Sequence, residues 1–190
     1  MVHCKQSVPL QGVERVFMNF RKTFRVIQNP NPEVLIVTCF DPRFEEAMDA
    51  FPYEVLHLKK GAFILTKPGG GPTPLAYPVK TPSRCKAAAK QIMFTCNKFP
   101  SIVEVVLVSH GGKCGYYSTI PHHYYEDGME EDDLSLGGSL MQIILPKHRI
   151  NLYNAALING GRETEFRRVP ISQEILTPPF DWKKSYQLSH

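Results

Sequence analysis

The sequence predicts an α/β protein in which a mainly parallel central β-sheet is flanked by helices. Residues 34–40 and 101–110 are near-continuous apolar runs, which are typical of strands buried on both faces of a sheet. A helical pattern lies between the two runs, at residues 83–98. Parallel strands need a long crossover connection, so strands that alternate with helices in this way favour a parallel sheet.

The other elements of the first half follow from the same patterns. The stretch "YEVLHLKKGAFIL", residues 53–65, comes after the first apolar run and supplies a further strand. The helix at residues 83–98 has Pro82 near its start and Pro100 just past its end, which are positions that proline favours around a helix. The second apolar run then returns the chain to the sheet.

The second half predicts two helices and one more strand. We expect a helix at residues 133–145, a break near Pro146, and a second helix that runs to about residue 158. The segment "GGRETEFRRVPISQEIL", residues 160–176, is typical of a turn followed by a final strand.

Length and composition indicate a single domain over residues 1–190. Of these residues 43% are hydrophobic and 21% are charged, which is ordinary globular composition, and no repeat or linker divides the chain. We divide the domain into an N-terminal arm or helix (1–32), a core that carries the candidate site (33–115), helices and a final strand (116–176), and a tail (177–190). Trp182 in the tail packs either on its own domain or on a partner subunit.

Charge and hydropathy exclude several classes of function. The net charge is +4, from 22 Lys and Arg against 18 Asp and Glu, and the basic residues are too scattered to indicate nucleic-acid binding. No window approaches the roughly 18 apolar residues of a membrane span, and the N-terminus lacks the layout of a secretory signal. We therefore expect a cytoplasmic protein that binds no membrane. The acidic run at residues 126–133 is expected to be a solvated loop that leads into a helix.

Two of the five cysteines stand where a ligand site is expected. The number is odd and no export signal is present, so we expect free thiols rather than a disulfide framework. Cys85 and Cys96 fit small residues on a helix. Cys39 and Cys114 each follow a predicted strand, and ligands of parallel sheets bind beyond the carboxyl ends of strands.

Cys39, His110 and Cys114 form a candidate metal site. If the strands that precede Cys39 and His110 are neighbours, their ends lie roughly 5 Å apart. Two thiolates and one imidazole suit tetrahedral zinc, and three protein ligands leave a fourth position for water or a substrate, as in catalytic sites. We therefore expect one Zn²⁺ per chain.

Asp41 and Arg43, which alternate with Cys39, are candidate catalytic residues. Asp41 is either the fourth ligand or a group beside the metal-bound water. A guanidinium paired with this carboxylate keeps it ionised, holds it away from the metal, and leaves it free to accept a proton or a hydrogen bond from the water. Arg43 thus decides which role Asp41 takes.

These residues resemble the motifs of the β-class carbonic anhydrases, which are C-x-D-x-R at the end of the first core strand and H-x-x-C-G at the end of a later one. This chain has "CFDPR" at residues 39–43 and "HGGKCG" at residues 110–115. A third family stretch, G-D-x-F-x-x-R-N-x-G, is matched in position by "GAFILTKPGG" at residues 61–70. The order and spacing of the three stretches agree over residues 33–115.

The resemblance implies a β-carbonic-anhydrase-like fold and reversible hydration of carbon dioxide to bicarbonate by a zinc-bound hydroxide. Asp41 would orient the hydroxide and Arg43 would orient Asp41. A homodimer or higher assembly is implied, with the active site at a subunit interface. His57, His122 and His123 are candidate proton shuttles. Candidate substrate-pocket residues are Phe40, Phe44, Lys67, Gly69, Gly70, Gly111 and Tyr116.

Three departures from the family pattern lie beside the site. Pro42 replaces a serine, which removes a hydroxyl and a backbone donor. The His-to-Cys spacing is longer by one residue, so the loop must bulge, and Gly111 and Gly112 make this feasible. Lys67 and Pro68 replace the Arg and Asn of the third stretch.

Other functions remain open alongside carbon dioxide hydration. The same fold and metal would serve a hydrolase of carbon disulfide or carbonyl sulfide. In a zinc-binding regulatory homologue, Asp41 would close the coordination sphere permanently. A thiol enzyme with Cys39 or Cys114 as nucleophile ranks last, because the chain lacks the C-x-x-C and C-x₅-R patterns of such enzymes.

Overall fold

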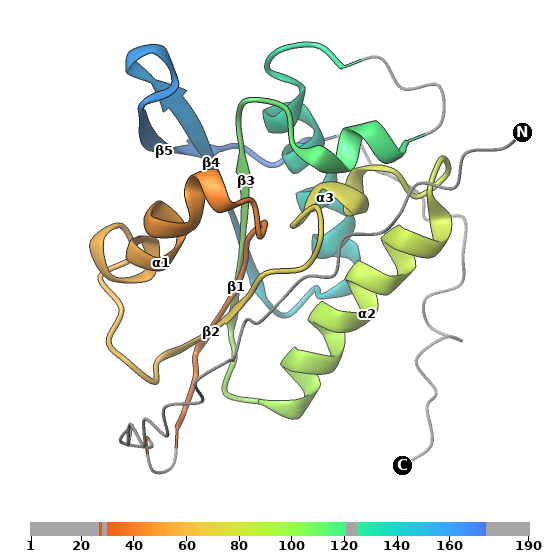
Figure 1. Cartoon of the computed structure of the whole chain (residues 1–190). Coiled ribbons are helices and arrows are strands. Elements are labelled where there is room, and N and C mark those ends of the chain that lie inside the picture. Colours follow the sequence, from red (N-terminus) through yellow and green to blue (C-terminus); the bar gives the residue numbers. More distant parts are fainter. Residues whose placement is uncertain (1–26, 28–29, 121–124, 174–190) are drawn as a thin grey trace, which may run out of the picture.

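The computed structural model describes residue 27, residues 30–120 and residues 125–173. In this part of the chain, strands and helices alternate around a central sheet (Figure 1). In chain order they are β1 Val34–Val37, α1 Glu45–Glu54, β2 Phe63–Thr66, α2 Pro82–Lys98, β3 Glu104–His110, α3 Met129–Ile144, β4 Arg149–Ile158 and β5 Glu163–Val169. Short 3-10 turns are η1 Pro42–Phe44, η2 Thr73–Ala76, η3 Gly115–Thr119 and η4 Asn159–Gly161. None of the described helices is long and apolar enough to cross a membrane.

The sheet has five strands in the order β2-β1-β3-β4-β5. β1 runs parallel to both β2 and β3, and β3 runs parallel to β4, whereas β5 pairs with β4 in antiparallel orientation. The predicted α/β class with a mainly parallel sheet is therefore confirmed. The two apolar runs became β1 and β3, and the helical pattern between them became α2.

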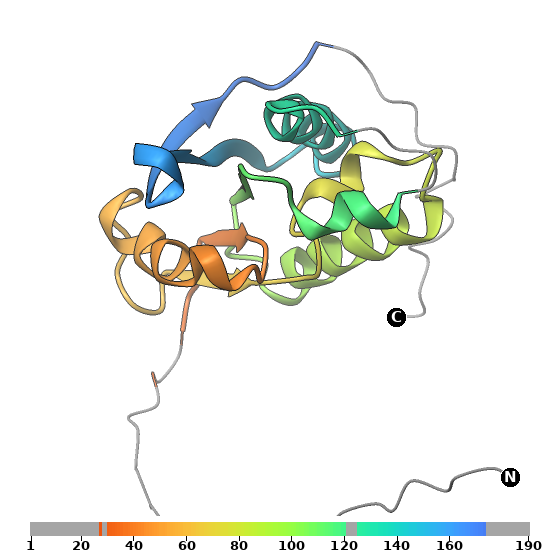
Figure 2. The same cartoon turned by 45° about the horizontal axis from the view of Figure 1, so that its top comes forward.

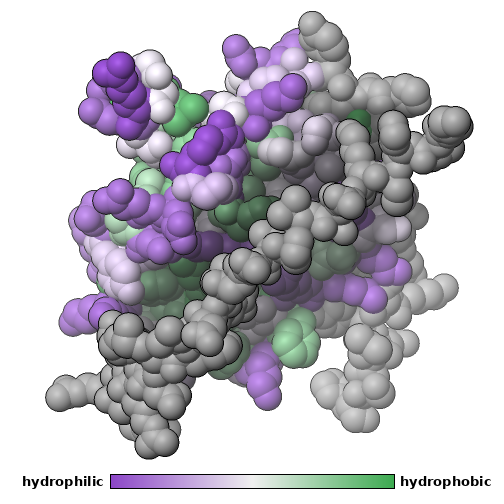
Figure 3. All heavy atoms as spheres, in the orientation of Figure 1, coloured by the Kyte–Doolittle hydropathy of each residue, from purple (hydrophilic) through white to green (hydrophobic). Residues whose placement is uncertain are grey.

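Helices cover both faces of the sheet, with α1 on one face and α2 and α3 on the other (Figure 2). Met48 and Phe51 of α1 pack against Ile36 of β1. On the opposite face, Leu35 of β1 and Leu107 of β3 pack with residues of α2 and α3. Because successive side chains of a strand point to opposite faces, both faces of β1 and β3 are buried, which explains their continuous apolar sequences. Hydrophilic residues cover the outer side of α1 and the turn between β4 and β5 (Figure 3).

Connections leave the neighbouring strands β1 and β3 in opposite directions. β1 continues through α1 to β2 on one side, and β3 continues through α3 to β4 on the other. Such a switch point opens a crevice beyond the carboxyl ends of the two strands. Cys39 follows the end of β1 and His110 ends β3, so the predicted adjacency of the two positions is confirmed.

One predicted helix is wrong. The residues expected to continue a helix to about residue 158 form β4, which lies between β3 and β5. The stretch "NAALI" contains good helix formers, but ladders with strands on both edges override such local preferences. This pairing also anchors the site, because Gly111 N donates to Ala155 O at 2.9 Å, directly after His110.

We expected the acidic run at residues 126–133 to be a solvated loop that leads into a helix. Only part of the run is such a loop. α3 begins within it at Met129, and the side chains of Glu130 and Asp133 are buried, at 3% and 6% exposure. Acidic residues are favourable in the first turn of a helix, because they complement the helix dipole. Their burial needs hydrogen-bond partners, and tyrosine hydroxyls near the candidate site supply them.

Candidate metal centre

Cys39, His110 and Cys114 come together at the carboxyl ends of β1 and β3. Their candidate ligand atoms all lie within 4.8 Å of one another. The two Sγ atoms are 3.9 Å apart, and all three residues are buried. The predicted juxtaposition of these side chains is therefore present in the fold.

Nε2 of His110 is a buried atom without a hydrogen-bond partner among the described residues. The other ring nitrogen, Nδ1, lies 3.0 Å from the carbonyl oxygen of Gly111 and donates to it, so the neutral imidazole carries its lone pair on Nε2. The ring also packs on Phe44, with centroids 4.5 Å apart. Both contacts fix the ring so that Nε2 remains available as a ligand atom.

The donor set fits zinc. In tetrahedral coordination with Zn–S distances near 2.3 Å, two sulfur ligands lie about 3.8 Å apart. The Sγ atoms of Cys39 and Cys114 have nearly this separation, and the third donor is the unpaired imidazole nitrogen. A buried lone pair with no partner costs free energy, which coordination of a metal would recover.

The two thiols differ in acidity. The hydrogen bond with Cys114 lowers the pKa of Cys39 to about 4 against the effect of burial, and His110 lowers it further. The same hydrogen bond, together with burial, raises the pKa of Cys114. The hydrogen bond between the two sulfur atoms therefore shifts the two pKa values in opposite directions.

Asp41 and Arg43 form the predicted ion pair beside this cluster. Nη2 of Arg43 donates to Oδ2 of Asp41 at 2.7 Å and Nε donates to Oδ1 at 3.0 Å, so the contact is bidentate. These hydrogen bonds lower the pKa of Asp41 to about 2. Oδ2 of Asp41 lies 3.7 Å from Nε2 of His110, which places the carboxylate next to the cluster.

Local backbone structure explains how the "CFDPR" segment holds this pair. Asp41 is the N-cap of η1, and its Oδ1 accepts a hydrogen bond of 3.0 Å from the backbone N–H of Arg43. Pro42 stands at the first position of η1, where a backbone donor would have no partner within the turn. The proline that departs from the family pattern therefore suits the turn. Nη1 of Arg43 also donates to Gly112 O at 3.0 Å, which joins the ends of β1 and β3.

The extra residue between His110 and Cys114 is accommodated by left-handed backbone. Gly112 has φ 71° and Lys113 has φ 57°, whereas Gly111 is not in this region. The sequence pointed to the two glycines, but the bulge uses one glycine and a lysine. Arg43 contacts this bulge through the carbonyl oxygen of Gly112.

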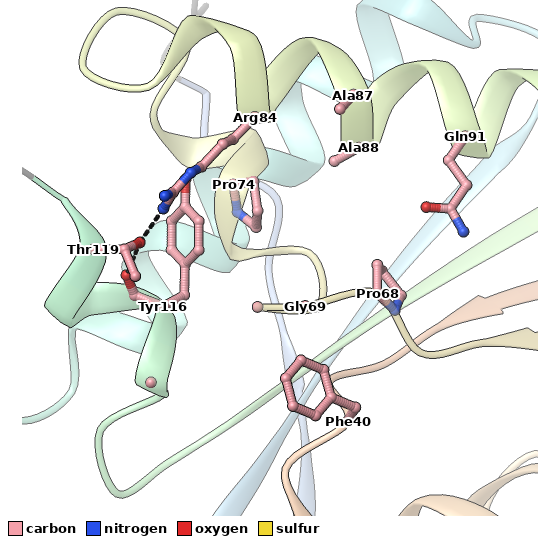
Figure 4. A pocket seen from close by; sticks show the side chains of 13 residues that line it. Phe40, Pro68, Gly69, Pro74, Arg84, Ala87, Ala88, Gln91, Tyr116 and Thr119 are labelled. Atoms are coloured by element: carbon pink, nitrogen blue, oxygen red, sulfur yellow. Dashed lines mark hydrogen bonds between the residues drawn. The ribbon is translucent and has the colours of Figure 1, made fainter.

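A cavity of about 470 Å³ lies beside the cluster, between the loop that follows β2, the helix α2 and the turn η3 (Figure 4). Phe40, Gly69, Gly70 and Tyr116, four of the predicted pocket residues, line it. Its walls are mostly apolar, and Arg84 reaches in from α2, donating to Thr119 and lying over the Tyr116 ring. The cavity borders Cys39 and Cys114 through their sequence neighbours Phe40 and Gly115.

The remaining predicted pocket residues do not line this cavity. Phe44 is 1% exposed and covers the His110 ring. Lys67 forms an ion pair with Asp49 of α1. Gly111 lies against the backbone of β4, where an added Cβ atom would be 3.7 Å from Ala155 O.

The candidate proton shuttles are not near the cluster or are not described. His57 is exposed in the turn before β2, at the amino end of the parallel strands, whereas the cluster lies at their carboxyl ends. His122 and His123, like Trp182 of the predicted tail, lie outside the described residues.

Sequence reasoning missed two features of the site. Gly71 packs so closely on Cys39 that a Cβ atom would lie 2.9 Å from the Cys39 nitrogen. The run of three glycines after Pro68 is the sequence signal of a close backbone approach, although the sequence does not identify Cys39 as the contact. Tyr125 and Glu130 contact the bulge before Cys114, and their position after a long loop gave no signal.

Comparison with known proteins finds similarity at the level of structure. No family model matches the chain, and no curated protein matches its sequence. The carbonic anhydrase of Streptococcus mutans is 17% identical over 78% of this chain and 87% of its own, with a TM-score of 0.46. The β-carbonic anhydrase isoform I of Trichomonas vaginalis is 12% identical over 79% and 88%, with a TM-score of 0.49. A carbonic anhydrase of Glaciozyma antarctica is 15% identical over 72% and 82%, with a TM-score of 0.44. The chain is thus structurally similar, at low sequence identity, to carbonic anhydrases that include a β-class enzyme.

Proposed function

We propose that this chain is a zinc-dependent enzyme that hydrates carbon dioxide reversibly to bicarbonate. The observation that carries the proposal is a buried Cys39–His110–Cys114 cluster next to a carboxylate that Arg43 holds in place. Three protein ligands are typical of catalytic rather than structural zinc sites. We propose carbon dioxide as the substrate because "CFDPR" and "HGGKCG" resemble the motifs of the β-class carbonic anhydrases.

The residues around the cluster have distinct roles in this reaction. Zinc held by Cys39, His110 and Cys114 would act as a Lewis acid and lower the pKa of a water molecule to roughly 7. Asp41 would accept a hydrogen bond from this water, since its pKa of about 2 keeps the carboxylate ionised at neutral pH. Arg43 fixes the direction of the Asp41 oxygens by binding both of them.

The ion pair favours an enzyme over a zinc-binding regulatory protein. A regulatory protein would use Asp41 as a permanent fourth ligand, but both of its oxygens accept hydrogen bonds from Arg43. Ligation by Asp41 would weaken this bidentate contact, which is among the stronger kinds of hydrogen bond. A zinc ion held by the three ligands would therefore keep its fourth position open for water.

A second candidate function uses the same centre on carbon disulfide or carbonyl sulfide. The observation in its favour is the mostly apolar cavity beside the cluster, which Pro68 and Gly69 help to line. An apolar approach suits these poorly hydrated substrates as well as it suits carbon dioxide. Comparison of kcat/KM for the three substrates decides between the two candidates.

We also propose that the chain acts as a cytoplasmic homodimer. Phe40 is 62% exposed at the rim of the cavity, and β2 is an edge strand of the sheet, so both are suited to contact a second copy. The four described cysteines are free, which fits a reducing compartment. Light scattering of the purified protein tests the assembly, and a monomer at all concentrations would contradict it.

Stopped-flow measurement of carbon dioxide hydration tests the proposed function. Protein with about one zinc per chain is expected to accelerate hydration, and the rate should rise with pH as the water ionises near pH 7. Zinc-loaded protein that leaves the hydration rate at the buffer value at every pH would contradict the proposal.

A further inference from the structure

The bulge before Cys114 places a lysine in an unfavourable backbone conformation. Lys113 has φ 57°, a region in which the Cβ of a residue other than glycine is crowded, at a cost of about 1 kcal/mol. Lys113 is bonded directly to the ligand Cys114, so a change in its backbone would move Sγ. The conformation therefore needs support from its surroundings.

Two side chains bind the backbone N–H of Lys113. It donates to Oη of Tyr125 at 3.1 Å and to Oε1 of Glu130 at 3.2 Å. The Tyr125 hydroxyl in turn donates to Oε1 of Glu130 at 2.5 Å. Burial and this hydrogen bond raise the pKa of Tyr125 to about 12, so its hydroxyl keeps the proton at neutral pH. The Lys113 N–H, the Tyr125 hydroxyl and the Glu130 carboxylate are thus each hydrogen-bonded to the other two.

This arrangement is attached firmly to the rest of the fold. Glu130 belongs to the first turn of α3 and is 3% exposed. The Tyr125 ring packs on Tyr117, with centroids 5.2 Å apart, and the Tyr117 hydroxyl donates to Oδ2 of Asp133 at 2.8 Å. The acidic start of α3 thereby connects the helix to the loop on both sides of Cys114.

We propose that Glu130 and Tyr125 are positioning residues that hold Lys113 in its left-handed conformation and so place the Cys114 sulfur for metal binding. This inference rests on the metal centre of the proposed function, but not on the identity of the substrate. Partners in the second shell of a metal site typically change its affinity 10–100-fold when they are removed. The extra residue of "HGGKC" thus requires a strained backbone, and the buried Glu130 supports that backbone.

Zinc affinity and cobalt spectra of variants test the proposal. Glu130→Ala is expected to weaken zinc binding about 10–100-fold in competition with a chelator. It should also alter the thiolate-to-metal absorption of the cobalt(II)-substituted protein, since Cys114 would no longer be held in place. Glu130→Gln should recover much of the affinity, because the amide retains Oε1 as an acceptor. Asp132→Ala is the matched control, because Asp132 lies on the same helical turn and is exposed.

A double-mutant cycle separates positioning from general stability. Lys113→Gly removes the crowded Cβ, so Glu130→Ala in this background should cost less zinc affinity than in the wild type. Tyr125→Phe, which removes one acceptor and retains the ring, provides the same test if Glu130→Ala fails to fold. Wild-type zinc affinity and cobalt spectra in Glu130→Ala, or in Tyr125→Phe, would overturn the proposal. Zinc-loaded wild-type protein without hydration activity would instead contradict the proposed function and leave this inference intact.

Discussion

Sγ of Cys39 and Sγ of Cys114 lie 3.9 Å apart, although the two residues are 75 positions apart in the sequence. Each cysteine follows a strand of the same parallel sheet, and the two strands are neighbours at the switch point. Sheet topology brings the two segments together, and the bulge between His110 and Cys114 completes the spacing of the sulfur atoms that tetrahedral zinc requires.

Replacement of Cys114 should remove the metal. Cys114→Ser is expected to lose zinc, because a neutral hydroxyl is a poor substitute for a thiolate ligand. Cys96→Ala, a buried thiol on α2, should retain about one zinc per chain in metal analysis. Full zinc occupancy in Cys114→Ser would exclude Cys114 from the site.

Removal of Arg43 should free Asp41. In Arg43→Ala, Asp41 is expected to bind the metal in place of water and to suppress hydration at neutral pH. In the metal-free protein, the pKa of Asp41 should rise from about 2 toward its usual 3.8, as measured by NMR titration of the carboxyl carbon. Arg162→Ala, an exposed arginine, is the control. A pKa and a hydration rate equal to those of the wild type would show that the ion pair is not needed.

The lowered pKa of Asp41 determines the direction in which the stability of the fold changes with pH. Asp41 has a lower pKa in the folded chain than in the unfolded one, so it stabilises the fold above about pH 4. This contribution is lost as the pH falls through about 2. The loss should be smaller in Arg43→Ala, which acid unfolding followed by circular dichroism measures.

Gly71 should tolerate no side chain. Gly71→Ala would place a Cβ 2.9 Å from the nitrogen of Cys39, in addition to the strain of a residue with φ 55°. Gly160→Ala is a matched control, because Gly160 has φ 68° and no atom within 4 Å of the added Cβ. We expect Gly160→Ala to cost about 1–2 kcal/mol of unfolding free energy and to keep its zinc affinity. Gly71→Ala should cost more and weaken zinc binding, and equal effects of the two changes in denaturant unfolding and chelator competition would contradict this.

Phe44 should contribute to both stability and the orientation of His110. Phe44→Ala is expected to cost about 3–5 kcal/mol of unfolding free energy, since the ring is 1% exposed and packs on His110. Phe94→Ala, at a site 67% exposed, should change the free energy by less than about 0.5 kcal/mol. Denaturant unfolding of the metal-free variants measures both, and similar losses at the two sites would argue against the role of Phe44.

The sequence could predict that the site lies at the carboxyl ends of two neighbouring strands. The apolar runs before Cys39 and His110 identify buried strands, and parallel topology then places their carboxyl ends together. The residue types, two thiols and one imidazole, then indicate a zinc site. Asp41 and Arg43 were predictable as a pair because the turn that contains them is only a few residues long.

Contacts that depend on distant segments could not be predicted. β4 contains "NAALI", whose local preferences favour a helix, and only its pairing with β3 and β5 makes it a strand. Glu130 stands in an acidic run that looks solvated, because nothing local shows that Tyr125 and the Lys113 backbone will cover it. In both cases the deciding partner lies on another element of the fold.

The occupant of the fourth zinc position distinguishes a site that activates water from one that Asp41 closes. A crystal structure of the zinc-loaded protein at neutral pH should show Cys39, His110 and Cys114 as ligands, with a water molecule as the fourth. Asp41 should remain paired with Arg43, as in the present structure, where the shortest contact is 2.7 Å. Asp41 bound to zinc with the Arg43 contact broken, or zinc bound without either cysteine, would contradict the proposed catalytic site.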